Sequence, residues 1–299
     1  MKRRKFLKTA VSSVALISLP VSEVFASPQP KKTLPGKIKI SLNAYSFNAP
    51  LTSGAMNLDD MLEYAAKTGF EGVDITGYYF PGYPQAPTDE YIYHIKRNAF
   101  SLGLEICGTG VRNNFVQADA AAREAEKKHV KEWILVASKL GAQTLRIFAG
   151  NASHDGYTRE QALQWVIADI KECAEYAKQH GVVLAIQNHD DFLKTADQVE
   201  ELLKAVNSEW VGLMLDIGSY RTKADSFAEI EQTIKYAITW QIKEEMFVNG
   251  QVVKTDMDKI RKIIDASSFR GYLPIETLGA GDPKQKVDNM FKEVKRRFP

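Results

Sequence analysis

The chain has 299 residues, of which 44% are hydrophobic and 25% are charged, with 19 Gly and 11 Pro. This composition is typical of a folded globular protein and excludes a disordered, collagen-like or coiled-coil chain. The two cysteines, Cys107 and Cys173, are too few for a disulfide framework or a CxxC zinc site.

A signal peptide is predicted at residues 1–26. A basic run that contains Arg3-Arg4 precedes an apolar stretch at residues 11–20, and the side chains of Val24 and Ala26 are small enough for cleavage after Ala26. The pattern is typical of twin-arginine export, so we expect a periplasmic protein with a short linker at residues 27–36. Past this leader no apolar stretch is long enough to span a membrane, and we expect no membrane contact after cleavage. The alternative is a cytoplasmic basic arm followed by the start of an apolar helix.

The charge balance argues against a nucleic-acid partner. The full chain carries +2, but the leader holds five of the basic residues and one acidic residue, so residues 27–299 carry 34 basic and 36 acidic side chains. Proteins that bind a phosphate backbone usually present a basic stripe. The basic cluster at residues 292–297 is instead suited to the last turns of a terminal helix.

A repeated strand–helix unit organises residues 37–299. Gly69, Gly103, Gly141 and Gly181 each stand where a helix needs a left-handed C-terminal residue, and an apolar strand follows each one. Their spacings of 34, 38 and 40 residues are the length of one strand–helix unit.

The helix starts and the strand count predict the fold. Thr158 with Gln161 and Thr195 with Gln198 are capping boxes by pattern, and Asn57 and Thr88 are candidate N-caps. Eight strands in about 260 residues predict a single α/β domain with the (β/α)8 TIM barrel fold. An open doubly wound sheet is the alternative, but the first strand–helix turn lacks a Gly-rich phosphate fingerprint. The predicted strands are residues 38–47, 72–76, 104–109, 144–148, 182–189, 212–218, 238–244 and 271–277.

Alternation along these strands places an unusually polar set of side chains inside the barrel. Buried carboxylates are costly unless they are paired, hydrogen-bonded or bound to a metal, and active sites of this fold lie at the C-terminal ends of the strands. We therefore expect the active site among the inward residues, which are Asn43, Tyr45, Asp74, Thr76, Arg146, Gln187, His189, Asp216, Gln241, Lys243 and Glu276.

Four strand ends resemble a known family. Residues 184–189 (LAIQNH), 212–218 (GLMLDIG), 240–244 (WQIKE) and 274–278 (PIETL) are similar to the metal-binding strand ends of the xylose isomerase-like barrels, the sugar isomerases and epimerases. The resemblance implies that a Glu, an Asp, a His and a Glu hold one divalent cation, often manganese, and that the two Glu residues move substrate protons.

The sequence departs from this family pattern at two positions. Gln187 stands where the first Glu is expected, and Gln241 stands where the His is expected. Because hard cations also accept amide oxygens, Gln187, Asp216, Gln241 and Glu276 remain the predicted ligands of one Mn²⁺ or Mg²⁺ ion. His189 is a candidate replacement ligand. The chain would then belong to an exported subgroup with degenerate metal ligands.

Catalytic roles are predicted for Glu276, Lys243 and His189. Glu276 would abstract a proton, and Lys243 would stabilise a developing oxyanion, matching a lysine common after the family's strand-7 His; the alternative is that Lys243 only pairs with Glu244 or Asp216. His189 would carry protons or bind the metal, or else form hydrogen bonds at the barrel mouth.

Asn43, Tyr45 and Arg146 are the predicted substrate contacts. Arg146 could equally form a structural ion pair with Asp74, and Tyr45 could be a packing residue. The aromatic loop at residues 78–83 is of the kind that stacks on sugar faces.

The predicted function is that of a metal-assisted sugar isomerase or epimerase whose partner is a small carbohydrate, acting by proton abstraction next to a carbonyl. A lyase or hydratase that acts on a 3-ketoglycoside is the second possibility. The third is a carbohydrate-binding barrel without catalysis.

Overall fold

A computed structural model describes residues 37–152, 156–189 and 191–299 of the chain. The predicted signal peptide and linker, residues 1–36, lie outside these residues.

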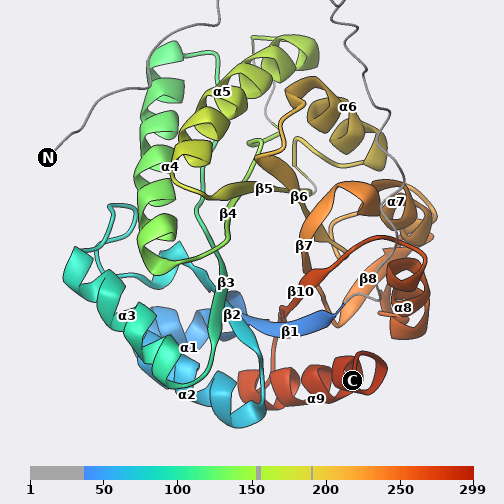
Figure 1. Ribbon diagram of the computed structural model, residues 1–299. Helices are drawn as coiled ribbons and strands as arrows, with labels where there is room; N and C mark the ends of the chain where they lie inside the picture. The colour runs from blue at the N-terminus through green and yellow to red at the C-terminus, as the bar shows by residue number, and fades with distance from the viewer. Residues whose placement is uncertain (1–36, 153–155, 190) are drawn as a thin grey trace, which may run out of the picture. The chain divides into compact units, whose positions relative to one another are not determined.

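Eight parallel strands form the barrel that was predicted, and they are neighbours in the order β10-β1-β2-β3-β4-β5-β6-β7. The ring closes where Ile242, just past β7, pairs with Ile275 of β10, with Ile242 N donating to Pro274 O at 2.8 Å. Figure 1 looks along the barrel and shows the ring of strands inside a ring of helices. The strands are β1 (Ile38–Asn43), β2 (Gly72–Thr76), β3 (Glu105–Gly110), β4 (Thr144–Ile147), β5 (Val183–Gln187), β6 (Val211–Asp216), β7 (Ala237–Gln241) and β10 (Gly271–Ile275).

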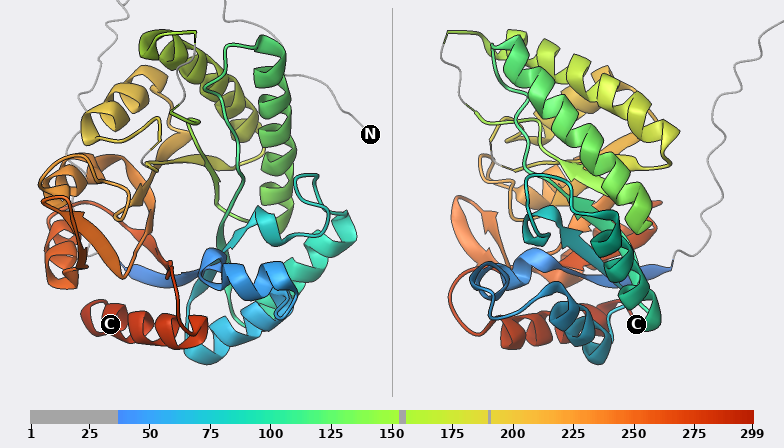
Figure 2. Two further views of the ribbon diagram at one scale, coloured as in Figure 1. Left: turned by 180° about the vertical axis from the view of Figure 1, so that it is seen from behind. Right: turned by 90° about the vertical axis from the view of Figure 1, so that its left-hand side faces the viewer.

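Helices cover the outside of the barrel, as the two further views in Figure 2 also show. In the described part of the chain, no helix is long and apolar enough to cross a membrane. The helices are α1 (Asn48–Ser53), α2 (Leu58–Thr68), α3 (Asp89–Ser101), α4 (Ala120–Leu140), α5 (Arg159–Gln179), α6 (Ala196–Val206), α7 (Ser226–Thr233), α8 (Met257–Asp265) and α9 (Pro283–Arg297).

The local signals that predicted these helices are confirmed. Asn57 and Thr88 cap α2 and α3, and the capping boxes predicted at Thr158 and Thr195 are both formed. The four glycines that were expected to end helices all have positive φ, between 68° and 96°. Because only glycine adopts this conformation readily, each one turns the chain from a helix back toward the next strand.

The first predicted strand is too long. It ends at Asn43, and residues 44–47 form a 3-10 turn because the Asn43 side chain accepts a hydrogen bond from Tyr45 N at 2.9 Å. Tyr45 therefore lies on this turn rather than on the strand.

The seventh predicted strand is also wrong at its end. It stops at Gln241, and a separate antiparallel hairpin follows, made of β8 (Glu245–Val248) and β9 (Gln251–Lys254). Its turn is Asn249-Gly250, both with positive φ, which is a strong hairpin signal that the strand prediction overlooked.

The remaining strand ends differ from the prediction by two residues at most, and one of these differences concerns His189. The fifth strand ends at Gln187, which leaves His189 in the following loop.

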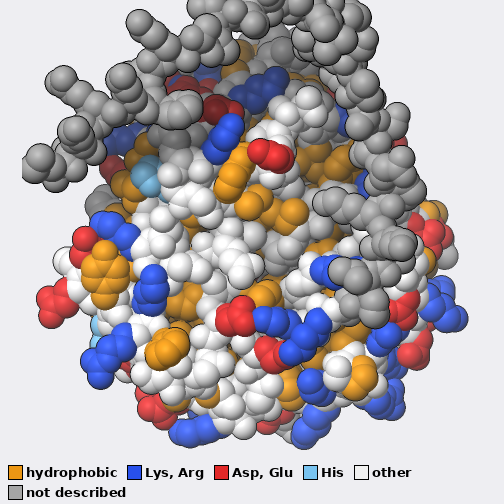
Figure 3. Space-filling view, in the orientation of Figure 1, with side chains coloured by type: hydrophobic (Ala, Val, Ile, Leu, Met, Phe, Trp, Pro, Cys, Tyr) orange, Lys and Arg blue, Asp and Glu red, His pale blue; other side chains and the backbone are white. Residues whose placement is uncertain are grey.

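In the orientation of Figure 1, acidic and basic side chains intermingle around the edge of the described surface (Figure 3).

The apolar core lies between the strands and the helices. Leu213, Leu215, Trp240, Leu273 and Ile275 are fully buried, as expected from their assignment to the outward face of the strands. Their burial against the helices leaves the alternate side chains of β6, β7 and β10 to face the barrel interior.

Candidate functional site

A cavity of about 750 Å³ lies at the C-terminal ends of the barrel strands. The side chains that line it come from the strand ends and the loops that follow them. Most of them are polar or aromatic, which is the composition expected of a site for a small polar ligand. They are Asn43, Tyr45, Asn48, Thr76, Tyr78, Tyr83, Arg112, Asn113, Arg146, Phe148, Asn151, Gln187, His189, Asp191, Ser219, Arg221, Gln241, Lys243, Glu276 and Leu278.

The Lys243 ammonium group bridges two carboxylates at the floor of this cavity. Its Nζ lies 2.7 Å from Glu276 Oε2 and 3.1 Å from Asp216 Oδ2. The side chain of Asp216 is fully buried, that of Glu276 is 7% exposed and that of Lys243 is 13% exposed. Burial by itself lowers the pKa of Lys243, but Asp216 and Glu276 raise it by more, so the net pKa lies above its ordinary value. Lys243 is therefore a cation at neutral pH and not a base.

Asp216 is saturated with hydrogen bonds. Its Oδ2 accepts from Gln187 Nε2 at 2.8 Å and from Ser219 Oγ at 2.9 Å, in addition to its contact with Lys243. Its Oδ1 accepts from Gly218 N at 2.9 Å. These donors and the Lys243 ammonium satisfy both oxygens of the buried carboxylate.

The Gln241 amide has two orientations. With its oxygen toward Gln187, it accepts from Gln187 Nε2 at 2.7 Å. With its nitrogen in that place, it donates to Glu276 Oε2 at 3.0 Å and to Asp216 Oδ2 at 3.1 Å. The second orientation gives both carboxylates a donor, but it leaves the amide nitrogens of Gln241 and Gln187 only 2.7 Å apart.

These residues do not fit a divalent cation while Lys243 holds this position. The four side chains predicted as ligands do meet, but they comprise two carboxylates and two amides, and the ammonium contacts both carboxylates. Among the residues that the structure describes, no group of three or more His, Cys, Asp or Glu side chains could hold a metal. A divalent site requires ligands whose lone pairs are available, and here they accept hydrogen bonds from nitrogen and hydroxyl donors.

His189 lines the same cavity but lies away from the ammonium cluster. Its Nδ1 is 3.3 Å from Asp191 Oδ2, and its ring packs edge-on to Phe148 with 4.8 Å between the ring centres. The side chain is 42% exposed. His189 therefore borders the cavity at its solvent side, and its role as a proton carrier remains a prediction.

The three predicted substrate contacts also line the cavity, and Arg146 is the most firmly held of them. Its Nη1 donates to Val111 O at 2.6 Å and to Tyr78 Oη at 3.1 Å, and its guanidinium lies 4.3 Å from the centre of the Phe148 ring. Tyr45 contacts Tyr78 edge-on, with 6.4 Å between ring centres. These aromatic and guanidinium groups form one wall of the cavity.

Asp74 lies beneath this wall. It is buried, and its Oδ2 accepts from Asn43 Nδ2 at 3.2 Å. Burial raises the pKa of Asp74, and Glu276 adds to this effect, while Arg146 and Asn43 lower the pKa by less. The net pKa is about 6. Asp74 thus changes its charge near neutral pH.

Several lining residues were not predicted. Ser219 lies three residues after Asp216 and donates to it, while Asn113 exchanges hydrogen bonds with the backbone of Phe148, at 2.8 Å in both directions. Both lie in loops after strands, where strand alternation gives no signal. The aromatic loop did give a signal, and its Tyr78 and Tyr83 line the cavity.

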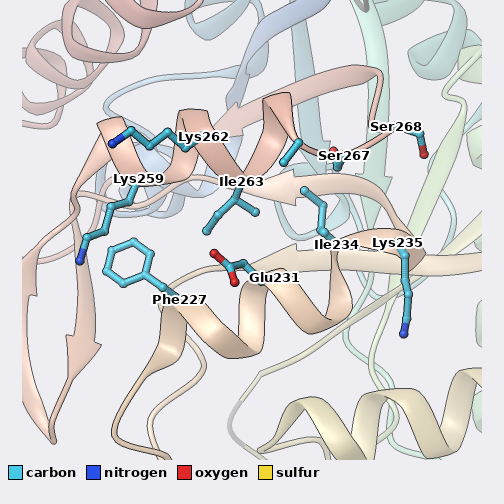
Figure 4. Close-up of a pocket in the computed structure, with 10 residues that line it drawn as sticks. Phe227, Glu231, Ile234, Lys235, Lys259, Lys262, Ile263, Ser267 and Ser268 are labelled. Atoms are coloured by element: carbon cyan, nitrogen blue, oxygen red, sulfur yellow. The ribbon is translucent and has the colours of Figure 1, made fainter. Parts of the chain in front are cut away.

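A second cavity, of about 810 Å³, lies on the outer surface between α7 and α8. Figure 4 shows its lysines, Lys235, Lys259 and Lys262, at the edges of an apolar floor that includes Phe227 and Ile263. None of the predicted site residues lines it. The predicted catalytic and substrate-binding residues instead line the cavity at the strand ends.

A comparison with family models places the chain among known proteins. A family model described as the xylose isomerase-like TIM barrel matches residues 62–295. No curated protein matches the chain by sequence.

Solved structures share the fold at low sequence identity. The 3-keto-D-glucoside 4-epimerase from E. coli is 13% identical, with a TM-score of 0.71, and the match covers 87% of this chain and 100% of that one. A probable 3-DHS dehydratase from Bacillus anthracis is 18% identical, with a TM-score of 0.66, covering 86% and 98% of the two chains. The IOLI protein, solved with a bound zinc atom, is 17% identical, with a TM-score of 0.67 and coverage of 87% and 96%.

Proposed function

Because the chain belongs to the xylose isomerase-like TIM barrel family, we propose that it is an enzyme that transfers a proton at a carbon next to a carbonyl group of a carbohydrate. The observation that carries this proposal is the Lys243 ammonium held between Asp216 and Glu276 at the floor of a polar cavity. The arrangement puts a proton acceptor and a positive charge side by side.

Each of the two groups has its own role in the proposal. Glu276 takes a proton from the carbon next to the carbonyl, and the electron pair of that C–H bond moves onto the carbonyl oxygen. An ammonium group has three N–H donors, and Lys243 directs two of them to carboxylates. The third is available to the substrate oxygen, where a fixed cation stabilises the negative charge that develops.

A reaction with one base is favoured over two-base epimerisation. Epimerisation needs a proton holder on each face of the carbon, and Gln187 cannot serve as one because an amide is not a usable base near neutral pH. The raised pKa of Lys243 keeps it protonated. The one remaining candidate is His189, which contacts Asp191 rather than the Lys243–Glu276 pair. We therefore favour isomerisation between an aldose and a ketose on one face.

A 3-ketoglycoside lyase or hydratase is the second candidate. It begins with the same proton abstraction by Glu276, but the electron pair then expels the leaving group at the next carbon. The same observation favours it, since elimination also requires a single base. The cavity of about 750 Å³ has room for a sugar with an attached group.

The test is a screen of aldoses, ketoses and 3-ketoglycosides in heavy water, followed by NMR. We expect turnover of one class and deuterium incorporation next to the carbonyl, and we expect Glu276→Gln to reduce both by about 10³-fold, as loss of a general base does. Glu244→Gln is the matched control, because Glu244 pairs with Lys286 at 3.0 Å and does not line the cavity.

Two results would contradict the proposal. Deuterium exchange that persists in Glu276→Gln would remove the role of this carboxylate. Binding of a sugar by calorimetry, with no turnover or exchange of any member of the screen, would favour the non-catalytic carbohydrate-binding barrel.

Export is a separate proposal. It is supported by Arg3-Arg4 and the apolar run at residues 11–20, and it would deliver the enzyme to the periplasm. Changing both arginines to Lys should leave the uncleaved chain in the cytoplasm. Normal periplasmic yield of that variant would contradict twin-arginine export.

A further inference from the structure

We propose that the Lys243 ammonium takes the place of a divalent cation in this barrel, and that removing it uncovers a site for Mn²⁺ or Mg²⁺. The inference concerns binding only, so it stands or falls independently of turnover.

The oxygen atoms around Lys243 have the spacing of a cation site. With the Gln241 oxygen toward the carboxylates, this oxygen lies 3.0 Å from Glu276 Oε2 and 3.1 Å from Asp216 Oδ2. Neighbouring ligands of an octahedral Mg²⁺ ion with bonds of 2.0–2.1 Å are separated by about 3 Å. In this orientation the Gln241 oxygen therefore lies at a suitable distance from each of the two carboxylate oxygens for all three to bind one hard cation.

The ammonium competes for this position by charge and by contact. Lys243 Nζ is within 3.1 Å of both carboxylates, so a dication that bound the same oxygens would face a like charge at close range in a buried site. Lys243 also reduces the net charge of the cluster from −2 to −1. With Lys243 removed, two carboxylates would balance a divalent ion completely.

The surrounding residues hold the Asp216 carboxylate and the backbone of Glu276 in place without the lysine. Asp216 is fixed by Gly218, Ser219 and Gln187, and Glu276 N donates to Ile242 O at 2.9 Å. The Asp216 oxygens and the strand end that carries Glu276 would therefore remain close to their present positions in a lysine variant. A prearranged ligand set binds a cation without first having to be ordered.

The experiment measures Mn²⁺ binding by calorimetry and by the loss of the free-ion EPR signal. The chains are wild type, Lys243→Met and Lys243→Ala, each stripped of metal and then titrated with MnCl₂. We expect no binding by wild type and one ion bound by each variant, with an affinity at least about 100-fold above the wild-type limit. Lys286→Met is the control, because Lys286 pairs with Glu244 away from the oxygen triad, and it should behave like wild type.

A second measurement covers the case in which the variants are unstable. Mn²⁺ should raise the melting temperature of Lys243→Met and leave that of wild type unchanged, because a ligand stabilises the state that binds it. Adding Asp216→Asn to Lys243→Met should abolish both the binding and the temperature shift.

Two outcomes would overturn the inference. Stoichiometric Mn²⁺ binding by wild type would show that the ammonium does not occupy the place of the cation. Absence of binding and of a melting shift in both lysine variants would show that the three oxygens do not form a cation site.

Discussion

The barrel mouth contains two buried acid–base clusters that use their cations in opposite ways. On the side of β6, β7 and β10, Lys243 touches both Asp216 and Glu276. On the side of β1, β2 and β4, Arg146 instead donates to Val111 O and Tyr78 Oη. Asp74, the carboxylate of this second cluster, accepts a hydrogen bond from the neutral Asn43.

The comparison teaches that a buried cation can be held either by carboxylates that it touches or by neutral oxygen atoms and aromatic rings. Arg146 lowers the pKa of Asp74, but burial outweighs it and the pKa rises to about 6. In the other cluster the pKa of Lys243 is raised by the two carboxylates it contacts, which holds the lysine positive. In the first cluster the group with a raised pKa is the lysine, and in the second it is the carboxylate of Asp74, which can take up a proton near neutral pH.

The largest effect on stability is expected from Lys243→Met. This change keeps most of the side-chain volume but leaves the buried carboxylates of Asp216 and Glu276 without their cation. Breaking a buried ion pair in this way typically costs about 3–5 kcal/mol. Urea unfolding in metal-free buffer at pH 7 would measure the loss.

Lys286→Met is the matched control for that measurement. Lys286 pairs with Glu244 at 3.0 Å, but both side chains are partly exposed, and such pairs contribute about 0–1 kcal/mol. An equal loss in the two variants would contradict the view that the Lys243 cluster is held together by its buried charges.

Asp74→Asn is expected to change how stability depends on pH. The folded pKa of Asp74 is about 6 and its ordinary value is 3.8, so the folded state binds the proton more tightly than the unfolded state. Below about pH 4 Asp74 is protonated in both states, and its contribution to stability is complete. As pH rises from about 4 through 6, wild type should lose about 3 kcal/mol that Asp74→Asn does not lose.

The measurement is the free energy of unfolding of both chains at pH 4, 5, 6 and 7. Other titrating groups are common to the two chains, so the difference between their curves isolates Asp74. Parallel curves would show that burial does not raise the pKa of this carboxylate, and the contrast between the two clusters would be lost.

The barrel itself was predictable because its signals are local. Gly69 and Gly141 take the left-handed conformation that ends α2 and α4, and this could be inferred from each glycine and its neighbours. The two-residue period of a strand also put Asp216 and Glu276 on the inner face, where the structure brings them together.

The contacts past the strand ends were less predictable, because they depend on where the chain turns. Tyr45 and His189 leave their expected strands when a side-chain cap or a loop takes over. Lys243 was considered as a partner of Asp216 or Glu244. The structure confirms Asp216 but gives Glu276 as the second partner. The reason is that β10 closes the ring beside β7, and this long-range pairing has no local signal.

The smallest effect is expected from Tyr78→Phe, which tests how the second cluster holds its cation. Tyr78 Oη accepts from Arg146 Nη1 at 3.1 Å, and losing this partly buried acceptor should cost about 1 kcal/mol because the donor is charged. The ring stays in place beneath the guanidinium, 5.5 Å from ring centre to Cζ, so the cation–π contact is retained. Tyr79→Phe is the control: its hydroxyl donates to the neutral Asn48 at 2.9 Å at an exposed position, and its loss should cost only a few tenths of a kcal/mol. If the two variants lose equal stability in urea unfolding, Arg146 does not depend on Tyr78, and its guanidinium is held by Val111 O and the aromatic rings alone.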